Sequence, residues 1–547
     1  MGRTTPFTSL IRVLRASLLA ESQGYPVPDV LETIQVPSAH KASHSISRRE
    51  LLIGAGTTGA ALAVGAIPWL PPHIAVAAPA SSPLSVGIVG AGLAGLACAD
   101  TLKTRGIRAS IYEAETRTGG RCWSLRSFFP GQVAERGGEL IDNLHKTMLS
   151  YAKRFRLTVE DVNKEPGEGF YLFYGKRYSE AAVVAEFRDF ISTMRVDLNR
   201  LSREVTATSH TPDDVALDRT SLRAYLDGHN STGTSAGPLA RAAIIAAYEA
   251  EYGLAADEQS CLGFLLFVHA DRRSKFTPFG SSDERYHLVD GNDRIIQGLA
   301  GELSGQISYS SKLLRVRKLS DGRIELTLQQ GSRTITVAHD VAVLAIPFTT
   351  LRQVDLDVNL GLPPAQRAAI QGLGYGTNAK MMVAFSSRPW QVLGGNGASY
   401  SDLPNHQTTW ETNPTLGSPT RGILTDYSSG PRGAKLDPTA VQTEASRFLQ
   451  DLNLVYPGSL GAASLINGQY RAYLEHWPSN PLMIGSYTCY RPGQFTSMAG
   501  LEGLPVDNLL FAGEHTNSFY EWQGFMEGAA LSGIAAAKSI LAMAKAR

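Results

Sequence analysis

The chain has 547 residues, of which 51 are lysine or arginine and 50 are aspartate or glutamate, and 43% are hydrophobic. This length exceeds what one simple core holds, so we expect two or more domains. The near-zero net charge gives no electrostatic footprint of a nucleic-acid or anionic-membrane partner, and we expect no nucleic-acid ligand. The cysteines are scattered, which argues against a disulfide framework and against a metal site: Cys98, Cys122, Cys261 and Cys489.

The first 80 residues have the features of a targeting segment. Arg48 and Arg49 form a twin arginine that directly precedes an apolar stretch, rich in glycine and alanine, to about Ile67. Small residues then offer A-x-A cleavage sites at 75–77 or 78–80. This pattern predicts export of the folded protein by the twin-arginine machinery, to the periplasm or the outside of the cell. Retention at the membrane through an uncleaved signal is the alternative, although the apolar run is short for a stable span.

A glycine-rich turn lies between a predicted strand and a predicted helix. Apolar residues at 86–89 predict a buried parallel strand, and small residues at 94–102 predict the helix. Between them Gly90, Gly92 and Gly95 have the G-x-G-x-x-G spacing. The first glycine of this spacing permits a tight turn, the second lets a pyrophosphate approach the backbone, and the third lets helix and strand pack closely. The helix N-terminus attracts the phosphates, so the stretch predicts a dinucleotide site.

A second strand and an acidic residue complete this motif. Residues 109–112 predict a strand that ends in Glu113, at roughly the twenty-residue distance expected of the carboxylate that binds a ribose hydroxyl. An R-x-G-G-R segment follows, in Arg117, Gly119, Gly120 and Arg121. This segment resembles the one after the ribose acid in FAD enzymes of the amine oxidase superfamily. By that resemblance FAD is favoured over NAD, the glycine pair lets another loop pass near the pyrophosphate, and arginine neutralises it.

The remaining pattern alternates between the cofactor domain and a second domain. We predict an export signal and leader at 1–80, an FAD-binding domain made of 81–158, 285–350 and 484–547, and a substrate domain made of 159–284 and 351–483. The expected elements are a glycine-pivoted acidic segment at 134–142, a helix at 147–157, a mainly helical insertion at 181–256, a helix at 295–303, strands at 307–316, 324–329 and 333–337, and a buried strand at 341–347.

Four separated segments together resemble flavin-dependent monoamine oxidases and their bacterial relatives, including L-amino acid oxidases. They are 90–121, then 376–380 with Trp390, then Trp477 with 485–488, and finally 511–516 with 522–529. The resemblance covers the chain from Ser85 to Ile540. It implies an α/β fold in which a glutathione-reductase-like Rossmann domain that binds FAD is interleaved with an α+β substrate domain carrying a mixed sheet and a helical insertion.

The same resemblance implies four catalytic residues. Lys380 matches the lysine that holds a water against flavin N5 and aids the reaction of reduced flavin with oxygen, and a solvent-facing strand lysine is the alternative. Tyr487 and Phe525 match two aromatic residues that flank the substrate amine, and two plain core residues are the alternative. Phe525 departs from the family, in which two tyrosines are usual. Trp477 matches a tryptophan near the flavin ring.

Further residues match cofactor-binding positions in the family. Backbone near Leu313 is expected at the adenine end, Glu514 at the ribityl chain, and the Met526 N–H at the pyrimidine end of the flavin. His515 is expected to face the cofactor rather than to catalyse. Ser486 stands where animal monoamine oxidases carry the cysteine that attaches to the flavin, so we expect FAD to be non-covalent. The predicted set also contains Gly137, Gly138 and Glu139, in a loop that passes the flavin, and Gly513 and Gly524.

The expected substrate class depends on the same loop. L-amino acid oxidases of the superfamily bind the carboxylate with an arginine just after the loop glycines, where this chain has Leu140, with Arg136 nearby. Glu139 favours a cationic group, such as a diamine or a basic side chain. We therefore expect a primary amine to be oxidised to an imine, then to an aldehyde or ketone and ammonia, with oxygen reduced to hydrogen peroxide.

Several alternatives stay open. An L-amino acid oxidase would give a 2-oxo acid, and an amine dehydrogenase would use a quinone in place of oxygen. Carotenoid desaturases share the dinucleotide and double-glycine segments, and a non-catalytic FAD-binding protein would keep every cofactor motif. A homodimer is also left open by the sequence.

Overall fold

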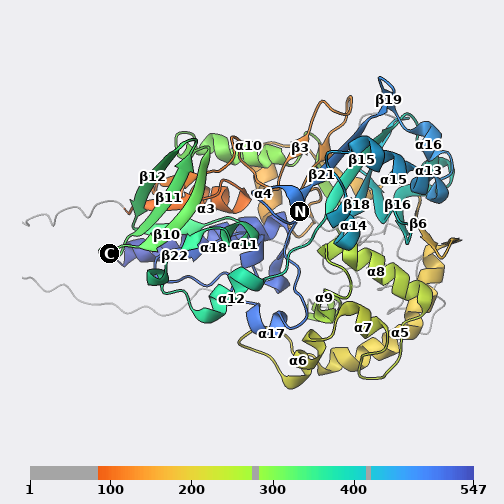
Figure 1. Cartoon of the computed structure of the whole chain (residues 1–547), viewed down its shortest axis with the longest axis horizontal. Coiled ribbons are helices and arrows are strands. Elements are labelled where there is room, and N and C mark those ends of the chain that lie inside the picture. Colours follow the sequence, from red (N-terminus) through yellow and green to blue (C-terminus); the bar gives the residue numbers. More distant parts are fainter. Residues whose placement is uncertain (1–83, 165, 274–282, 414–419, 547) are drawn as a thin grey trace, which may run out of the picture.

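The computed structural model describes residues 84–547, apart from residues 165, 274–282, 414–419 and 547. The expected export signal and leader therefore lie outside the described residues. Within the described part, two large sheets and a group of helices lie side by side (Figure 1). No helix in that part is long and apolar enough to cross a membrane.

Five parallel strands form the first sheet, in the order β22-β13-β1-β2-β9. Its central strand β1 pairs with β13 on one side and β2 on the other, and all residues of β1 and β13 are buried. Short apolar strands buried on both faces are what an all-parallel sheet requires. Three separated stretches of the chain supply these strands: β1 (Val86–Val89) and β2 (Ala109–Tyr112), then β9 (Ile307–Ser308) and β13 (Val341–Leu344), then β22 (Leu509–Phe511).

Alternate residues of these strands point to opposite faces of the sheet, one packed against helices and the other against an antiparallel meander. Ile88 and Val343 pack into a core with the helices, whereas Val89 and Leu344 pack into a core with an antiparallel meander. Helices α3 and α18 approach closely, since a Cβ at Gly533 would lie 2.0 Å from the Ala94 carbonyl oxygen. The helices are α3 (Leu93–Lys103), α4 (Lys146–Arg154), α10 (Asp293–Glu302) and α18 (Met526–Lys545), and the meander is β10 (Ser311–Lys318), β11 (Ile324–Gln330) and β12 (Arg333–His339), extended by β14 (Asp355–Leu356).

The second sheet has seven strands and is mixed, because β6 and β16 pair in parallel while the other neighbours are antiparallel. On β15, Met381 and Val383 pack under α15 (Val441–Val455), whereas Met382 and Ala384 pack on the opposite face against the segment near Ala134. Lys380 shares that second face by the two-residue period of a strand. In sheet order the strands are β21 (Ala472–His476), β15 (Ala379–Phe385), β18 (Gly422–Ser428), β17 (Thr408–Glu411), β16 (Gly395–Ser401), β6 (Glu168–Phe173) and β7 (Lys176–Tyr178).

A helical group completes the molecule and borders the second sheet (Figure 1). Ser179 and Thr211 cap α5 and α6, and Thr211 forms a full capping box with Asp214. This group confirms the helical insertion expected at 181–256. Its members are α5 (Glu180–Arg200), α6 (Pro212–Asp218), α7 (Leu222–Leu226), α8 (Pro238–Tyr252) and α9 (Cys261–Arg273).

Most expected elements are confirmed, and three boundaries are wrong. The single strand expected at 307–316 is two, because the chain turns at Ser310, whose φ is +52°. The helix expected at 147–157 ends at Arg154, before Arg156 adopts a φ of +56°. The buried strand expected at 341–347 ends at Leu344. The domain boundaries themselves stay a prediction.

Short elements connect these parts. They are β3 (Ser124–Leu125), β4 (Ala134–Glu135), β5 (Val159–Asp161), β8 (Tyr286–Leu288), β19 (Leu465–Ile466), β20 (Gln469–Tyr470), α11 (Phe348–Leu351), α12 (Pro364–Gly372), α13 (Pro389–Val392), α14 (Gly430–Lys435), α16 (Ser459–Ala462), α17 (Phe495–Met498), and the 3₁₀ turns Val162–Lys164, Val358–Leu360, Trp477–Ser479, Glu514–Thr516 and Phe519–Glu521.

Candidate active site

A groove runs past the carboxyl ends of the first sheet's strands. Ligands of open parallel sheets bind at this edge. The groove brings together most of the predicted cofactor residues, although they come from distant parts of the sequence. Those that line it are Gly90, Gly92, Glu113, Gly119, Gly120, Arg121, Leu313, Gly513, Glu514 and Met526. Gly95, Arg117, Gly137, Gly138, Glu139 and Gly524 are not among the described residues that line it.

The glycine turn has the geometry that its spacing predicts. Gly90 has a φ of +101°, and a Cβ there would lie 2.6 Å from the Ala345 carbonyl oxygen. A Cβ at Gly95 would lie 2.0 Å from the Gly90 carbonyl oxygen, so helix α3 approaches the turn in a way that only glycine allows. At Gly92 an added Cβ would meet no protein atom within 4 Å. That open backbone, at the N-terminus of α3, is suited to a phosphate.

Glu113 is held by the backbone with its carboxylate at the groove. Its two oxygens accept hydrogen bonds from Ala91 N at 2.7 Å and from Glu115 N at 2.8 Å. Burial raises the pKa of Glu113, and these two N–H groups oppose that rise. Each oxygen keeps a second lone pair, which a ribose diol can use.

The two arginines of the R-x-G-G-R segment have different surroundings. Arg121 lines the groove and forms an ion pair of 2.9 Å with Glu514. Arg117 instead braces its own loop, since it pairs with Glu115 at 2.8 Å, donates to the Gly120 carbonyl and stacks on Trp123. Arg121 therefore lines the groove, whereas Arg117 is not among the described residues that line it.

At the other end of the groove, Glu514 and His515 are both buried. Burial alone would raise the pKa of Glu514, but the Arg121 guanidinium and the Thr488 hydroxyl hold it below its usual value. Burial lowers the pKa of His515 to about 4, so this imidazole is neutral near pH 7. Neither His515 ring nitrogen has a hydrogen-bond partner within the described chain.

These features test whether the groove suits FAD. Unpaired buried polar atoms are rare and call for a partner, and His515, which lines the groove, has two such atoms. The glycine turn suits a pyrophosphate, and Glu113 suits a ribose. The residues present therefore fit an extended dinucleotide such as FAD.

A second, smaller cavity, here called the aromatic cavity, adjoins the groove at Phe525, which lines both. Tyr487 also lines it, and its hydroxyl donates to the backbone carbonyl of Glu251 and lies 3.3 Å from the Tyr427 hydroxyl. Glu251 is the one charged residue among the described residues around this cavity. The lining is Glu251, Tyr252, Gln259, Ser260, Gly263, Tyr487, Thr488, Cys489, Tyr490, Phe495, Phe519, Gln523, Gly524 and Phe525.

The glycine loop from Glu135 to Glu139 is held by side chains from three directions. Lys380 donates to the carbonyls of residues 135 and 137, at 3.0 and 2.9 Å. Trp477 Nε1 donates to the carbonyl of residue 136 at 3.0 Å. Asn292 Nδ2 donates to the carbonyls of residues 138 and 139, at 3.1 and 2.6 Å. Every carbonyl of this loop therefore accepts a side-chain hydrogen bond.

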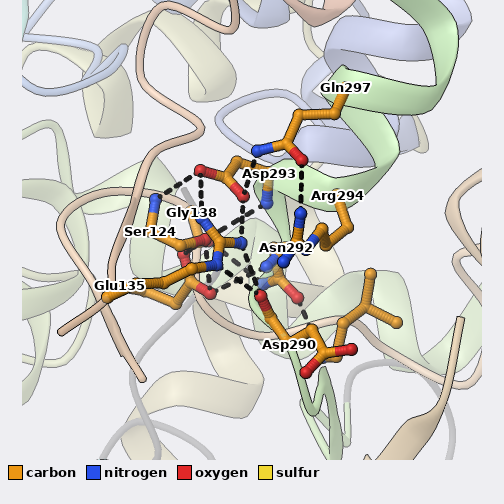
Figure 2. Close-up of polar contacts among 10 residues, drawn as sticks. Ser124, Glu135, Gly138, Asp290, Asn292, Asp293, Arg294 and Gln297 are labelled. Carbon is orange, nitrogen blue, oxygen red and sulfur yellow. Dashed lines mark hydrogen bonds and ion pairs between the residues drawn. The ribbon is translucent and has the colours of Figure 1, made fainter. Parts of the chain in front are cut away.

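The loop also rests on a buried polar network, which Figure 2 shows. Glu135 accepts hydrogen bonds from the Ser124 hydroxyl and from Asn292 N, and Asp293 accepts from Ser124 N. Burial raises the pKa of Glu135 to about 8. A Cβ at Gly137 would lie 1.7 Å from the Arg121 carbonyl oxygen, so the loop packs directly on the R-x-G-G-R segment.

Lys380 is 3% exposed, which overturns the alternative of a solvent-facing strand lysine. It points from β15 to the loop, and it forms an ion pair of 2.6 Å with Glu139. Lys380 and Trp477 line neither cavity among the described residues. Their catalytic roles stay predictions. Both side chains contact the carbonyls of the glycine loop.

Glu139 and Arg136, which were expected to influence substrate binding, both contact other protein side chains. Glu139, expected to favour a cationic substrate group, already contacts Lys380 and Trp410 Nε1. Arg136 pairs with Glu475 and stacks on Trp123 at 3.0 Å, so its guanidinium is engaged away from the aromatic cavity. Leu140 is a buried apolar residue.

Sequence reasoning missed three residues of this site: Asn292, Trp410 and Glu251. Each lies on an element distant in sequence from the residues it contacts, and none belongs to a local motif. Ser486 donates to Asn378 Oδ1 at 2.5 Å, in keeping with a residue that forms no bond to a cofactor.

Comparisons with known proteins agree with this geometry. The family model for flavin-containing amine oxidoreductases matches residues 93–541. "Putative L-amino-acid oxidase YobN" of Bacillus subtilis is 26% identical over 482 residues, which cover 84% of this chain and 95% of YobN. The L-amino-acid oxidase of Pseudechis australis is 21% identical and covers 84% of this chain and 87% of its own.

Solved structures show the same fold. Putrescine oxidase with bound putrescine has a TM-score of 0.69 at 20% identity, and cyclohexylamine oxidase from Brevibacterium oxydans has 0.70 at 20%. Each alignment covers 84% of this chain and 99% of the other. The protein is therefore an FAD-dependent enzyme that oxidises CH–NH2 donors, and it belongs to the family of flavin-containing amine oxidoreductases.

Proposed function

We propose that this amine oxidoreductase acts on primary amines and passes their electrons to oxygen. The carrying observation is the lining of the aromatic cavity, which has one carboxylate residue, Glu251, and no lysine or arginine among its described members. A cationic or neutral amine is compatible with such a lining. The free carboxylate of an amino acid would instead be buried without a cation, which is costly.

The residues around the cavity have complementary tasks in this proposal. Tyr487 and Phe525 hold the amine carbon at the junction with the groove, and the dry aromatic walls favour the uncharged amine that reacts. FAD held without a covalent bond by the glycine turn, Glu113 and Arg121 would supply an acceptor for the two electrons and the hydrogen that leave the amine carbon. Lys380 lies behind the glycine loop as a fixed positive charge, which favours reduction of oxygen.

The overall reaction balances without a further reductant. The substrate loses one C–H and one N–H hydrogen as the C=N bond of the imine forms. Water then adds to the imine and releases ammonia and an aldehyde or ketone. One oxygen molecule takes up two electrons and two protons and leaves as hydrogen peroxide.

Oxidation of L-amino acids is the second candidate. Relatives named as L-amino-acid oxidases align over 84% of this chain, which supports it. The engaged Arg136 and the apolar Leu140 speak against it, because neither offers a free cation near the aromatic cavity. A quinone as the electron acceptor would leave this site geometry unchanged.

Anaerobic bleaching of the flavin separates these candidates. The purified holoenzyme is mixed with primary amines, polyamines and L-amino acids, and then air is admitted and peroxide is assayed. Bleaching by amines followed by fast peroxide formation is the expected result. Bleaching by amino acids alone would refute the amine proposal, and slow reoxidation would favour a dehydrogenase. Lys380→Met should keep FAD and reoxidise about 100-fold more slowly, as for loss of one preorganised charge.

We also propose export by the twin-arginine route, on the basis of Arg48 and Arg49. Replacing both by lysine should retain the protein in the cytoplasm of an expressing cell. Fractionation with a known cytoplasmic marker measures this, and unchanged export of the double-lysine variant would overturn the proposal.

A further inference from the structure

Three side chains form a buried cluster behind the glycine loop. Lys380 from β15, Trp410 from β17 and Glu139 from the loop are each 4% exposed or less. Glu139 Oε2 lies 2.6 Å from Lys380 Nζ, and Glu139 Oε1 accepts from Trp410 Nε1 at 2.8 Å. One carboxylate thus joins β15 and β17, two strands of the second sheet, to the glycine loop.

The ammonium group of Lys380 has all three of its donors in use. They point to Glu139 Oε2 and to the carbonyls of residues 135 and 137, within 3.0 Å. An ammonium group has three N–H donors and no acceptor, so this arrangement determines the position of Nζ completely. Of the three acceptors, only Glu139 carries a charge that compensates the buried cation.

Aromatic rings complete the surroundings of this ion pair. Lys380 Nζ lies 5.6 Å from the centroid of the Trp410 ring and 5.8 Å from that of Tyr427. Such faces favour a cation and exclude water. Removal of one member of a buried, desolvated ion pair leaves the other charge uncompensated, whereas removal of both does not.

We propose that Glu139 is the positioning residue of Lys380, that Trp410 positions Glu139 in turn, and that through them the ammonium is held at one place where it speeds reduction of oxygen. Glu139 therefore does not select a cationic substrate. The proposal rests on the oxygen-directed role of Lys380 given above. In the affected step, two electrons and two protons go to one oxygen molecule and give one hydrogen peroxide, and Glu139 itself is neither oxidised nor reduced.

A double-mutant cycle tests this on the FAD-loaded protein. The flavin is reduced by stoichiometric anaerobic titration with dithionite, with no amine present, then oxygen is added and the return of flavin absorbance is timed. Glu139→Gln should slow reoxidation by about tenfold or more, and the double variant with Lys380→Met should be no slower than Lys380→Met alone, because residues that act as a unit are not additive. Glu139→Asp should recover part of the rate.

A second readout does not depend on redox chemistry. Urea unfolding at saturating FAD should show that Glu139→Gln and Lys380→Met each lower stability, and that the double variant is more stable than the sum of the single effects predicts. The surface pair Lys103 and Glu302, 2.9 Å apart and each more than 40% exposed, is the matched control and should show no such coupling.

The outcomes separate this proposal from the proposed function. A Glu139→Gln protein that folds, binds FAD and reoxidises at the original rate would overturn the positioning role, as would additive effects in both cycles. If Glu139→Gln does not fold, Trp410→Phe keeps the ion pair while removing one hydrogen bond, and unchanged reoxidation in that variant would overturn the role of Trp410. No amine enters these experiments. Their result can therefore be interpreted even if no amine bleaches the flavin and the proposed substrate class is wrong.

Discussion

The long groove and the aromatic cavity meet at Phe525, yet they are built in different ways. The groove is lined largely by short motifs, and Gly90 in its lining and Gly95 and Gly137 outside it leave no room for a Cβ. The aromatic cavity is lined by side chains from helices, loops and turns that are far apart in sequence. The comparison shows why the cofactor is evident from local motifs, while the substrate depends on which side chains the fold brings together.

The largest effect should come from breaking the backbone geometry of the groove. Gly95→Val would place its side chain against the Gly90 carbonyl oxygen, which an added Cβ already approaches to 2.0 Å. We expect the variant to lose FAD, and fluorescence titration with FAD measures this. Gly301→Ala is the control, because a Cβ there meets nothing within 4 Å. FAD binding of Gly95→Val at the original affinity would show that the close helix approach is not needed.

A smaller effect should follow from a change of charge in the aromatic cavity. Glu251→Gln should raise KM for amines about tenfold, with less change in kcat, since a hydrogen bond to a charged group contributes about 1.5–3 kcal/mol. Steady-state kinetics with one amine measures both constants. Glu258→Gln, whose partner is the half-exposed Arg491, is the control. Equal KM values in Glu251→Gln and the original protein would contradict the assignment of Glu251 to the substrate.

Acid should lower the free energy of unfolding through His515, which lines the groove. Its pKa is about 4 in the folded protein, against 6.5 for an unperturbed imidazole, so the folded state binds fewer protons in between. This contribution is fully present above pH 6.5 and is lost as the pH falls towards 4, and it amounts to about 3 kcal/mol. Urea unfolding of the cofactor-free protein at several pH values tests it. The His515→Gln variant should show a shallower loss over that range, and an identical slope would exclude His515.

The smallest effect is expected at the junction of the two cavities. Phe525→Tyr adds a hydroxyl to one wall of the slot and should change kcat about threefold, which corresponds to one modest hydrogen bond. Steady-state kinetics with the preferred amine at saturating oxygen measures kcat. A change of a hundredfold or more would show that the hydroxyl does more than adjust amine orientation.

Local motifs predicted the cofactor side of the site well. The strand at 86–89, the glycines, the strand at 109–112 and Glu113 lie in one continuous stretch, and even the hydrogen bond from Ala91 N to Glu113 spans only 22 residues. Arg117 and Arg121 have the same residue type four positions apart, yet one braces its loop and the other lines the groove. Spacing alone could not distinguish them, because the difference depends on where Trp123 and Glu514 lie.

The sequence by itself determined that this chain binds a dinucleotide, that a helical segment is inserted at 181–256, and that Lys380 stands in an apolar strand. Only the tertiary structure decided that Glu139 faces Lys380 and Trp410, that Asn292 holds the glycine loop, and that Glu251 reaches the aromatic cavity. The physical reason is the distance along the chain over which each interaction acts. Turn geometry and strand patterning act between neighbours in the chain, whereas a buried charge is compensated by whichever residue the packing of two sheets brings within hydrogen-bond distance.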